Sequence, residues 1–331
     1  MNVTTQSAGP LSEQSWHYRQ INARAPGLSY LSNALGTLLE QGHPVVVGTA
    51  DLSYSNGLVR FATAHPNRFI QFGISEQNMV SAAAGLATTG LIPYVATFAS
   101  FLALLACEQI RTDLAYSALP VRLIGHHAGI TLGFYGTSHH ATEDLAIMRS
   151  IADLTVIAPA DGPQLAAAIL ATVNHPEPIY FRIGRGQEPL VYPPDVTFEL
   201  GRAITHREGN ELTVIACGTM LHPSLAAVDA LRASGRSVGL LDMPTIKPID
   251  RDAILQAASA SRLLLTVEEH NVIGGLGGAV AEVLADAGVP ARLVRHGIHD
   301  EYSLIAPPTH LYRHYRLDAA GIETVAREVL A

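Results

Sequence analysis

The sequence predicts an α/β protein with two parallel-sheet domains, each a three-layer arrangement of a sheet between helices. Short β-branched runs alternate along the chain with Ala- and Leu-rich stretches of helical length, a pattern typical of parallel strands joined by crossover helices. The alternation stops at a stretch that contains Pro189, Pro193 and Pro194. A chain of 331 residues is also long enough for two domains of ordinary size. The expected segments are a lead segment, a first domain, a linker and a second domain, at 1–24, 25–188, 189–211 and 212–331.

In the first domain, each expected strand is a short apolar or β-branched run. These runs lie at 44–48, 68–73, 92–97, 121–125, 155–158 and 178–183. The expected helices between them lie at 75–89, 100–117, 142–151 and 163–173. Asp161 stands three residues before Gln164, which predicts a capping box at the start of the last of these helices.

The second domain is expected to repeat the alternation. Its predicted strands lie at 212–216, 238–242, 263–267 and 291–295, and its predicted helices at 223–233, 252–258, 278–286 and 322–330. Four strands with three crossovers would make a second parallel sheet.

The composition is rich in hydrophobic residues and poor in charged ones. Hydrophobic residues make up 48% of the chain and charged residues only 15%, against about 25% in typical soluble domains. A net charge of −8 without a basic patch argues against nucleic acid as a partner. We therefore expect a large core and a surface that another chain partly covers.

No segment predicts a membrane partner. The longest mostly apolar stretch, 95–107, is interrupted by Thr97 and Ser100 and is too short to span a bilayer. The N-terminus lacks a basic region followed by an apolar core, so no signal peptide is expected. Cys107 and Cys217 lie in apolar segments, as buried free thiols do. These features favour a cytoplasmic location.

The strongest local signal is the segment Gln-Phe-Gly-Ile-Ser-Glu-Gln-Asn-Met at 71–79, where a predicted strand leads into a helix and Glu76 falls at the turn. Ligands of parallel α/β sheets collect at the carboxyl ends of strands, so this is a favoured place for a functional carboxylate. An acidic residue in a first helical turn also has a purely structural explanation, because the helix dipole stabilises it there.

Several motifs together carry a family resemblance. The segment GISEQNMVSAAAGLATTGLIPYVATFASF at 73–101, the DLSYSN at 51–56 and the run at 127–139 resemble the pyrimidine-binding domain of transketolases. The TVIACGT at 213–219 and the EEHNVIGGLG at 268–277 resemble the transketolase C-terminal domain. The resemblance covers roughly residues 25–310, with the motifs in family order.

The resemblance implies thiamine diphosphate as the cofactor, bound by the first domain. Glu76 matches the family glutamate that hydrogen-bonds the aminopyrimidine ring and so promotes removal of the thiazolium proton. Phe98 and Phe101 match the segment that stacks on the pyrimidine, and Asp51 matches an acidic residue near the cofactor. Where many transketolases have a tyrosine in this segment, the chain has Leu104.

The substrate site is also implied by residue matching. His127 and His139 match histidines that line the substrate channel, bind sugar hydroxyls or phosphate, or assist proton transfer. Residue matching places either Arg182 or Arg185 at a sugar phosphate, with Arg185 preferred, and Ser55 matches another phosphate contact. From the residues alone, the pairs 126–127 and 139–140 could suggest a metal cluster, but no Cys or carboxylate pattern accompanies them. Adjacent histidines on a strand point to opposite faces, so at most one of each pair is expected to face a site.

One departure from the family concerns the donor substrate. Tyr135 occupies the position of an aspartate that recognises a donor hydroxyl in sugar phosphate transketolases, which puts the usual ketose donor in doubt. The favoured hypothesis is a transketolase that moves a two-carbon ketol unit to an aldehyde. The alternative is the beta subunit of a 2-oxo acid dehydrogenase-type or acyloin-forming enzyme with a pyruvate-like donor. A non-catalytic scaffold is disfavoured because Glu76, Phe101 and His139 are all present.

A missing motif predicts the assembly. The family holds the cofactor diphosphate through Mg²⁺ with a Gly-Asp-Gly sequence and a downstream asparagine, and this chain contains no Gly-Asp-Gly. The resemblance therefore implies a separate subunit that carries the diphosphate-binding domain and the Mg²⁺, in an α₂β₂ assembly. We expect no metal ligands in this chain.

Overall fold

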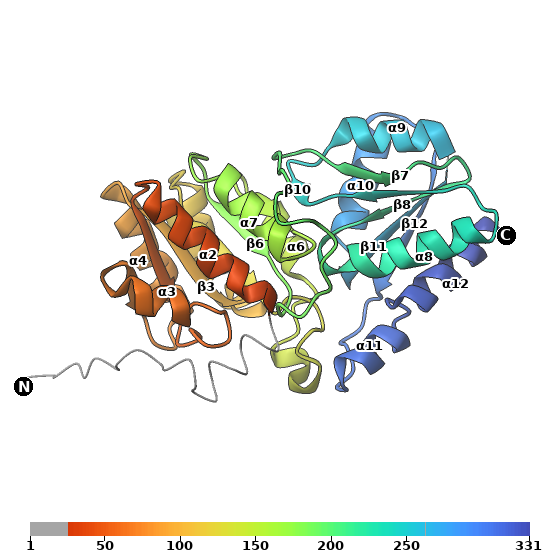
Figure 1. Ribbon diagram of the computed structural model, residues 1–331. Helices are drawn as coiled ribbons and strands as arrows, with labels where there is room; N and C mark the ends of the chain where they lie inside the picture. Colours follow the sequence, from red (N-terminus) through yellow and green to blue (C-terminus); the bar gives the residue numbers. More distant parts are fainter. Residues whose placement is uncertain (1–25, 262) are drawn as a thin grey trace, which may run out of the picture.

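The computed structural model describes residues 26–261 and 263–331, which form two α/β units side by side (Figure 1). Each unit is built on a mostly parallel sheet with helices on both faces, which confirms the predicted fold class. The expected lead segment 1–24 lies outside the described residues. None of the helices in the described part of the chain has the length and apolar content needed to span a bilayer.

The first sheet has seven strands in the order β10-β5-β6-β4-β3-β1-β2. Six of them are parallel and lie where the sequence predicts strands: β1 (Val45–Thr49), β2 (Phe69–Gln71), β3 (Ile92–Phe98), β4 (Arg122–His126), β5 (Thr155–Ile157) and β6 (Ile179–Arg182). Every residue of β1, β4, β5 and β6 is buried. Strands covered on both faces appear in a sequence as continuous apolar runs, which is why these were predictable.

Helices cover both faces of this sheet. One face packs against α2 (Pro26–Glu40), α3 (Val59–Ala64) and α7 (Gly162–Ala171), and the other against α4 (Glu76–Thr88) and α6 (Asp144–Ser150). Short 3₁₀ turns lie at η1 (Pro66–Arg68) and η4 (Gly133–Ser138). The predicted cap of α7 is confirmed, because the Asp161 carboxylate accepts the backbone N–H of Gln164 at 3.0 Å.

The single helix expected at 100–117 is instead broken into three pieces. A π-helical segment η2 (Phe101–Leu105) is followed by one turn of α-helix, α5 (Cys107–Gln109), and by a second π-helical segment, η3 (Ile110–Ala115). The break falls at Ala106, whose backbone leaves the helical region at ψ 11°. Buried apolar residues recur at helical spacing at Leu102, Ala106, Ile110 and Leu114, so the sequence pattern indicated a helix but not its wider turns.

The second sheet has the order β12-β11-β8-β9-β7. Its strands are β7 (Ile204–Arg207), β8 (Leu212–Ala216), β9 (Val238–Asp242), β11 (Leu263–Asn271) and β12 (Arg292–Ile298). Its four longer helices are α8 (Leu221–Ala233), α9 (Arg251–Ser261), α10 (Leu276–Asp286) and α12 (Ala319–Leu330). The short helix α11 (Pro308–His314) and the 3₁₀ turn η5 (Gly218–Met220) belong to the same unit. The four predicted strands are confirmed.

Two strands were not predicted, and both are edge strands of their sheets. The end of the stretch expected to be irregular, 189–211, forms β7, which pairs antiparallel with β9. The strand β10 (Thr245–Lys247) follows β9 in the chain but pairs antiparallel with β5 of the first sheet. The second half of the chain therefore completes the sheet of the first half, and the two units share a continuous apolar core.

A buried ion pair lies at the boundary between the two units. Arg182 and Asp144 meet at 2.9 Å with side chains only 3% and 0% exposed. The Asp144 carboxylate also accepts the hydroxyl of Tyr180 at 2.8 Å. The Arg182 guanidinium also donates to the backbone carbonyls of Ala141 and Glu269. Glu269 belongs to the second sheet.

We predict that Asp144→Ala lowers the free energy of unfolding by about 3–5 kcal/mol, because it leaves the Arg182 charge buried without its partner. Urea denaturation of the full chain measures the change. The control is Asp229→Ala, which removes the carboxylate from the partly exposed pair with Arg207 and is expected to change stability by less than about 1 kcal/mol. Equal effects of the two variants would contradict the prediction.

Candidate functional site

The predicted site residues follow neighbouring strands at the carboxyl edge of the first sheet. Asp51 and Ser55 follow β1, Glu76 follows β2, and Phe98 ends β3. His127 follows β4 and Arg185 follows β6. Because β6, β4, β3, β1 and β2 are consecutive neighbours, these residues lie along one edge, where parallel sheets bind ligands.

Glu76 is the first residue of α4 and is only 6% exposed. Its carboxylate Oε1 accepts the hydroxyl of Thr97 at 3.2 Å, and Thr97 directly precedes Phe98 on β3. Among the described residues this is the one hydrogen bond to the Glu76 side chain. No sequence pattern singles out Thr97, because its role depends on α4 reaching across β1 to β3.

The aromatic side chains gather into one ring cluster, which we define as Phe98, Phe101, His126, His127, Tyr135 and His139. Phe98 is at its centre, with ring centroids 5.5 Å from Phe101, 5.2 Å from His127 and 5.4 Å from His139. The ring of Tyr135 lies 4.8 Å from His139. The structure thus brings together five residues that the sequence assigned to cofactor and substrate binding.

The expectation for the first histidine pair is wrong. His126 and His127 do not point to opposite faces, because β4 ends at His126 and the backbone of His127 turns into the left-handed region at φ 56°. Their rings are 4.8 Å apart and both contact Phe98. A left-handed backbone at a residue other than glycine is strained and is common at functional sites. The second pair does divide, since His140 bonds Ser303 instead of entering the cluster.

The two histidines share one hydrogen bond, from Nδ1 to Nδ1 at 2.7 Å. The Nε2 of His126 is buried without a partner in the described residues, and a buried N–H without an acceptor is costly. The lower-cost arrangement has His126 donating from Nδ1, which leaves Nε2 of His127 as an N–H donor. His126 therefore belongs to the ring cluster, which strand periodicity did not predict.

Electrostatics keep this pair neutral. Burial, with the positive charge of Arg185, lowers the pKa of His127 to about 3. Burial also lowers the pKa of His126 far below its usual value and lowers the pKa of His139. The site therefore presents uncharged imidazoles at neutral pH.

Asp51 and Ser55 lie in the loop that follows β1. The backbone of Asp51 is left-handed at φ 60°, and its N–H donates to Gln71 at 2.7 Å. Next to Ser55, the buried Asn56 donates to Thr49 at 2.8 Å and fixes the loop on β1. Within the described residues no hydrogen bond joins Asp51 or Ser55 to the ring cluster.

Arg182 ends β6 and Arg185 follows it, but only Arg185 is available to a ligand. Arg182 is held in the buried pair with Asp144. The side chain of Arg185 is partly buried and forms no ion pair with the described residues. This separation supports the preference for Arg185 that came from residue matching.

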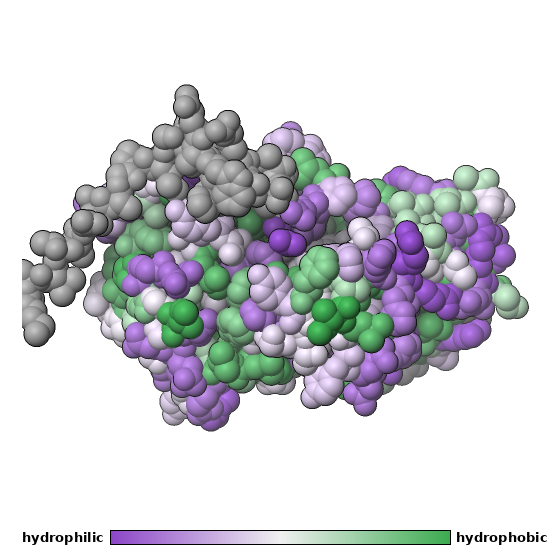
Figure 2. Space-filling model, turned by 90° about the horizontal axis from the view of Figure 1, so that it is seen from below, coloured by the Kyte–Doolittle hydropathy of each residue, from purple (hydrophilic) through white to green (hydrophobic). Residues whose placement is uncertain are grey.

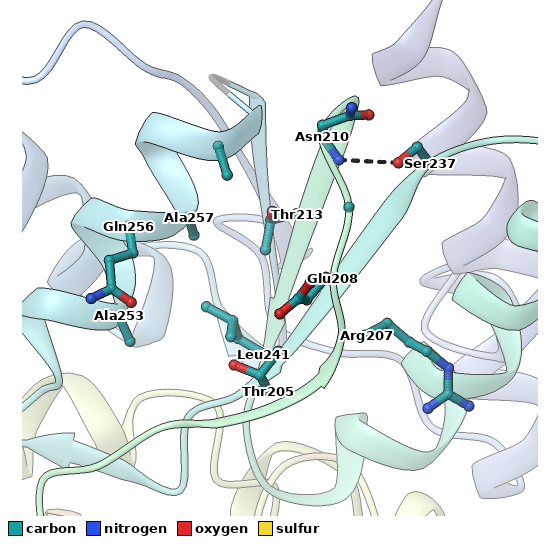
Figure 3. Close-up of a pocket in the computed structure, with 12 residues that line it drawn as sticks. Thr205, Arg207, Glu208, Asn210, Thr213, Ser237, Leu241, Ala253, Gln256 and Ala257 are labelled. Carbon is teal, nitrogen blue, oxygen red and sulfur yellow. Dashed lines mark hydrogen bonds between the residues drawn. The ribbon is translucent and has the colours of Figure 1, made fainter.

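A cavity of about 470 Å³ lies elsewhere, on the second unit, among β7, β8 and α9 (Figure 3). Small and polar side chains such as Thr205, Thr213 and Gln256 line it, and none of the predicted site residues does. In the described part of the chain, no group of three or more His, Cys, Asp or Glu is arranged to hold a metal ion.

The chain matches two protein families in succession. Residues 28–189 match the transketolase pyrimidine binding domain, and residues 201–322 match the transketolase C-terminal domain. The chain belongs to the transketolase family.

Known members of the family resemble this transketolase chain over most of its length. It is 40% identical over 299 residues to a putative transketolase C-terminal section from Methanocaldococcus jannaschii, covering 89% of this chain and 93% of that one. It is 38% identical over 296 residues to an apulose-4-phosphate transketolase subunit from Phocaeicola vulgatus, covering 88% and 94%. The solved structure of a split gene transketolase, described as an inactive beta4 tetramer, superposes with a TM-score of 0.83 at 38% identity, covering 92% and 97%.

We predict that His127 of this transketolase chain stays neutral down to a pH of about 3. An unfolded histidine binds its proton near pH 6.5, so the stability that neutral His127 contributes is complete above pH 6.5. That stability is lost as pH falls toward 3, by about 1.4 kcal/mol for each pH unit. Histidine-labelled NMR measures the titration, and denaturation between pH 7 and about 4 measures the stability.

The matched variant is His127→Asn, which cannot titrate. It identifies the His127 resonance by its disappearance, and its unfolding free energy should fall less steeply with acid than that of the wild type. A His127 resonance that titrates near pH 6 to 7 would show the prediction to be wrong.

Proposed function

We propose that this chain is the beta subunit of a split thiamine diphosphate-dependent transketolase, which transfers a two-carbon ketol unit from a ketose-type donor to an aldehyde. The observation that carries the proposal is the buried Glu76 carboxylate, which accepts the Thr97 hydroxyl of β3 at the same carboxyl edge of the first sheet where β3 ends at Phe98. The family membership and the similarity to transketolase subunits support the same activity.

The residues present fit the pyrimidine half of the cofactor. The Glu76 carboxylate is buried but accepts only one hydrogen bond from the described residues, so it has capacity to bond a ring nitrogen. Phe98 and Phe101 are partly buried and offer flat apolar surfaces in the ring cluster. When bound, the cofactor would supply a nucleophilic thiazolium carbon.

We assign the remaining steps to Glu76, to side chains of the ring cluster and to Arg185. Glu76 shares a proton with the aminopyrimidine and so assists its action as a base. His127 donates from Nε2 to an oxygen of the substrate, and its low pKa keeps it from acting as a cation. His139, which is less buried, binds a substrate hydroxyl or moves a proton, and Arg185 holds an anionic end of the substrate.

We further propose a separate partner subunit that holds the diphosphate and Mg²⁺, in an α₂β₂ assembly. Exposed apolar side chains support a covered surface: Phe134 on η4 is 67% exposed and Ile305 is 69% exposed. Gly136, with φ 66°, lets the η4 backbone pack against Ile305, so both lie in one region. Figure 2 shows the face that carries η4 and α11, with an apolar patch near its middle.

Tyr135 favours a second candidate, a pyruvate-like donor. Its ring packs against His139 where the family places an aspartate, so no carboxylate is offered at that position to a donor hydroxyl. A 2-oxo acid has no such hydroxyl to recognise. The alternative enzyme is then an acyloin-forming or 2-oxo acid dehydrogenase-type beta subunit.

We predict that the purified chain has no turnover alone and gains it when mixed with a partner chain that carries a Gly-Asp-Gly motif, thiamine diphosphate and Mg²⁺. A coupled assay with a ketose phosphate, an unphosphorylated ketose and pyruvate as donors measures both the activity and the donor class. Turnover of ketoses supports the transketolase, and turnover of pyruvate alone supports the second candidate. Activity of the chain without any partner would rule out the split arrangement.

We predict that Glu76→Gln lowers kcat of the reconstituted pair by at least about a hundredfold, because the amide cannot exchange the proton. The melting temperature should stay close to that of the wild type, since the side chain keeps its shape. The matched control is Glu108→Gln, which neutralises a first-turn carboxylate of α5 that is exposed and pairs with Arg111. Comparable kcat values in the two variants would refute the role of Glu76.

A further inference from the structure

His126 is the last residue of β4, and its side chain lies inside the first sheet's carboxyl edge. It is 0% exposed and stands opposite Phe98 in the parallel register of β4 and β3. The ring centroids of His126 and Phe98 are 4.9 Å apart. Because none of its surface is accessible, a bound ligand cannot contact His126 directly. Any part that this residue has in the chemistry passes through a neighbour.

The neighbour is His127, which the backbone turns back toward His126. The left-handed angle of His127, φ 56°, is held by two hydrogen bonds to the segment after β6. The N–H of His127 donates to the carbonyl of Gly184 at 3.1 Å, and the N–H of Ala128 donates to that of Ile183 at 3.1 Å. A strained angle kept in place by such bonds is a feature of functional sites.

The protons of the two rings have one low-cost arrangement. Both imidazoles are neutral at neutral pH, because burial lowers the pKa of each, so each ring carries one N–H. If His127 donated to His126 across the Nδ1–Nδ1 contact, the proton of His126 would lie on its Nε2, which is buried without an acceptor in the described residues. The reverse direction leaves no buried N–H unpaired. His127 then carries its own proton on Nε2.

The other histidine of the ring cluster has no such constraint. The Nδ1 of His139 lies 2.8 Å from the hydroxyl of Ser138, which can donate or accept. That hydroxyl also has the carbonyl of Tyr135 as an alternative acceptor at 3.2 Å. Either tautomer of His139 is therefore satisfied, whereas His127 faces a partner that can only donate.

We propose that His126 is a positioning residue that fixes His127 as a hydrogen-bond donor at Nε2. The inference rests on the proposed function, in which His127 bonds a substrate oxygen. A fixed donor selects an oxygen that can only accept, such as a carbonyl oxygen that gains negative charge during the reaction. It also needs no reorganisation as that charge develops. His127 in this state cannot take up a proton at Nε2, so any proton transfer between substrate and histidine falls to His139.

The first test is ¹⁵N NMR of the full-length chain with labelled histidines, without partner or cofactor. The expected shared proton is attached to Nδ1 of His126, with scalar coupling across the hydrogen bond to Nδ1 of His127. The Nε2 of His127 should carry its own proton. His139 should show no single fixed tautomer. A shared proton attached to His127, or no coupling between the two rings, would overturn the proposal.

Two variants of His126 separate the hydrogen bond from packing. His126→Phe keeps a ring on β4 and removes the donor, so the Nδ1 resonance of His127 should move to the position of an unbonded ring nitrogen. His126→Asn retains an N–H donor close to the place of Nδ1 and should restore the bonded position. The matched control is His296→Phe, which replaces another buried histidine, on β12, and should leave the resonances of His127 unchanged.

The same variants are then assayed in the reconstituted pair. His126→Phe should lower kcat at least about tenfold, as the loss of an orienting partner commonly does, with KM changed less than about threefold, because the bond matters most as the substrate oxygen gains charge. His126→Asn should recover most of kcat, and His296→Phe should match the wild type. Equal kcat in His126→Phe and wild type would contradict the inference, as would an equal loss in His126→Asn and His126→Phe.

The NMR experiment needs no turnover, which separates this inference from the proposed function. A wild-type pair without activity on any donor, in which the shared proton is nevertheless on His126, contradicts the function and leaves the hydrogen bond standing. Should His126→Phe fail to fold, the wild-type spectrum and His126→Asn still decide between the two directions of the bond.

Discussion

The arrangement of the two units depends on the Arg182 guanidinium, which is buried where the sheets approach each other. It can remain there only with its charge matched by Asp144 and its other N–H groups bonded to the carbonyls of Ala141 and Glu269. Buried ion pairs of this kind add little net stability, because desolvation offsets the attraction. Their effect is geometric: any shift of the second sheet against β6 would leave a buried donor without an acceptor. The pair thus fixes the end of β6 against the end of β11.

That constraint also shapes the candidate active site. Three residues beyond Arg182, the side chain of Arg185 lines a cavity between the two units and influences the His127 imidazole. An anion bound to Arg185 would reduce the positive potential at His127, and this would raise the pKa of that histidine. The anionic end of the substrate, which we assign to Arg185, is therefore electrostatically linked to the ring cluster through one side chain, without movement of either sheet.

The sequence predicted the fold well where strands are buried on both faces and poorly at the edge strands of the two sheets. The parallel strands are continuous apolar runs, and their order follows from crossover connections. By contrast, β7 contains Thr205, His206 and Arg207 and is only partly buried, and β10 is a three-residue strand that joins the sheet of the other unit. Local pattern carries no information about such tertiary pairing. For the site, residue matching predicted Phe98, Phe101 and His139, whose rings the structure brings together, but it did not predict the bond between His126 and His127, which depends on one left-handed backbone angle.

The exterior of the protein is even poorer in charge than the composition indicates, because several charged residues are buried. Asp144, Arg182, Asp242, Glu268 and Glu269 are all buried, so the exterior holds even less charge than 15% of the chain implies. Apolar side chains fill part of that exterior around η4 and residues 302–305, next to Tyr135 and the ring cluster. Isolated exposed apolar residues are ordinary, but a group of them beside a site is characteristic of protein interfaces. A partner that covers this surface would also close the open side of the ring cluster, so the assembly we propose would exclude water from the site that it completes.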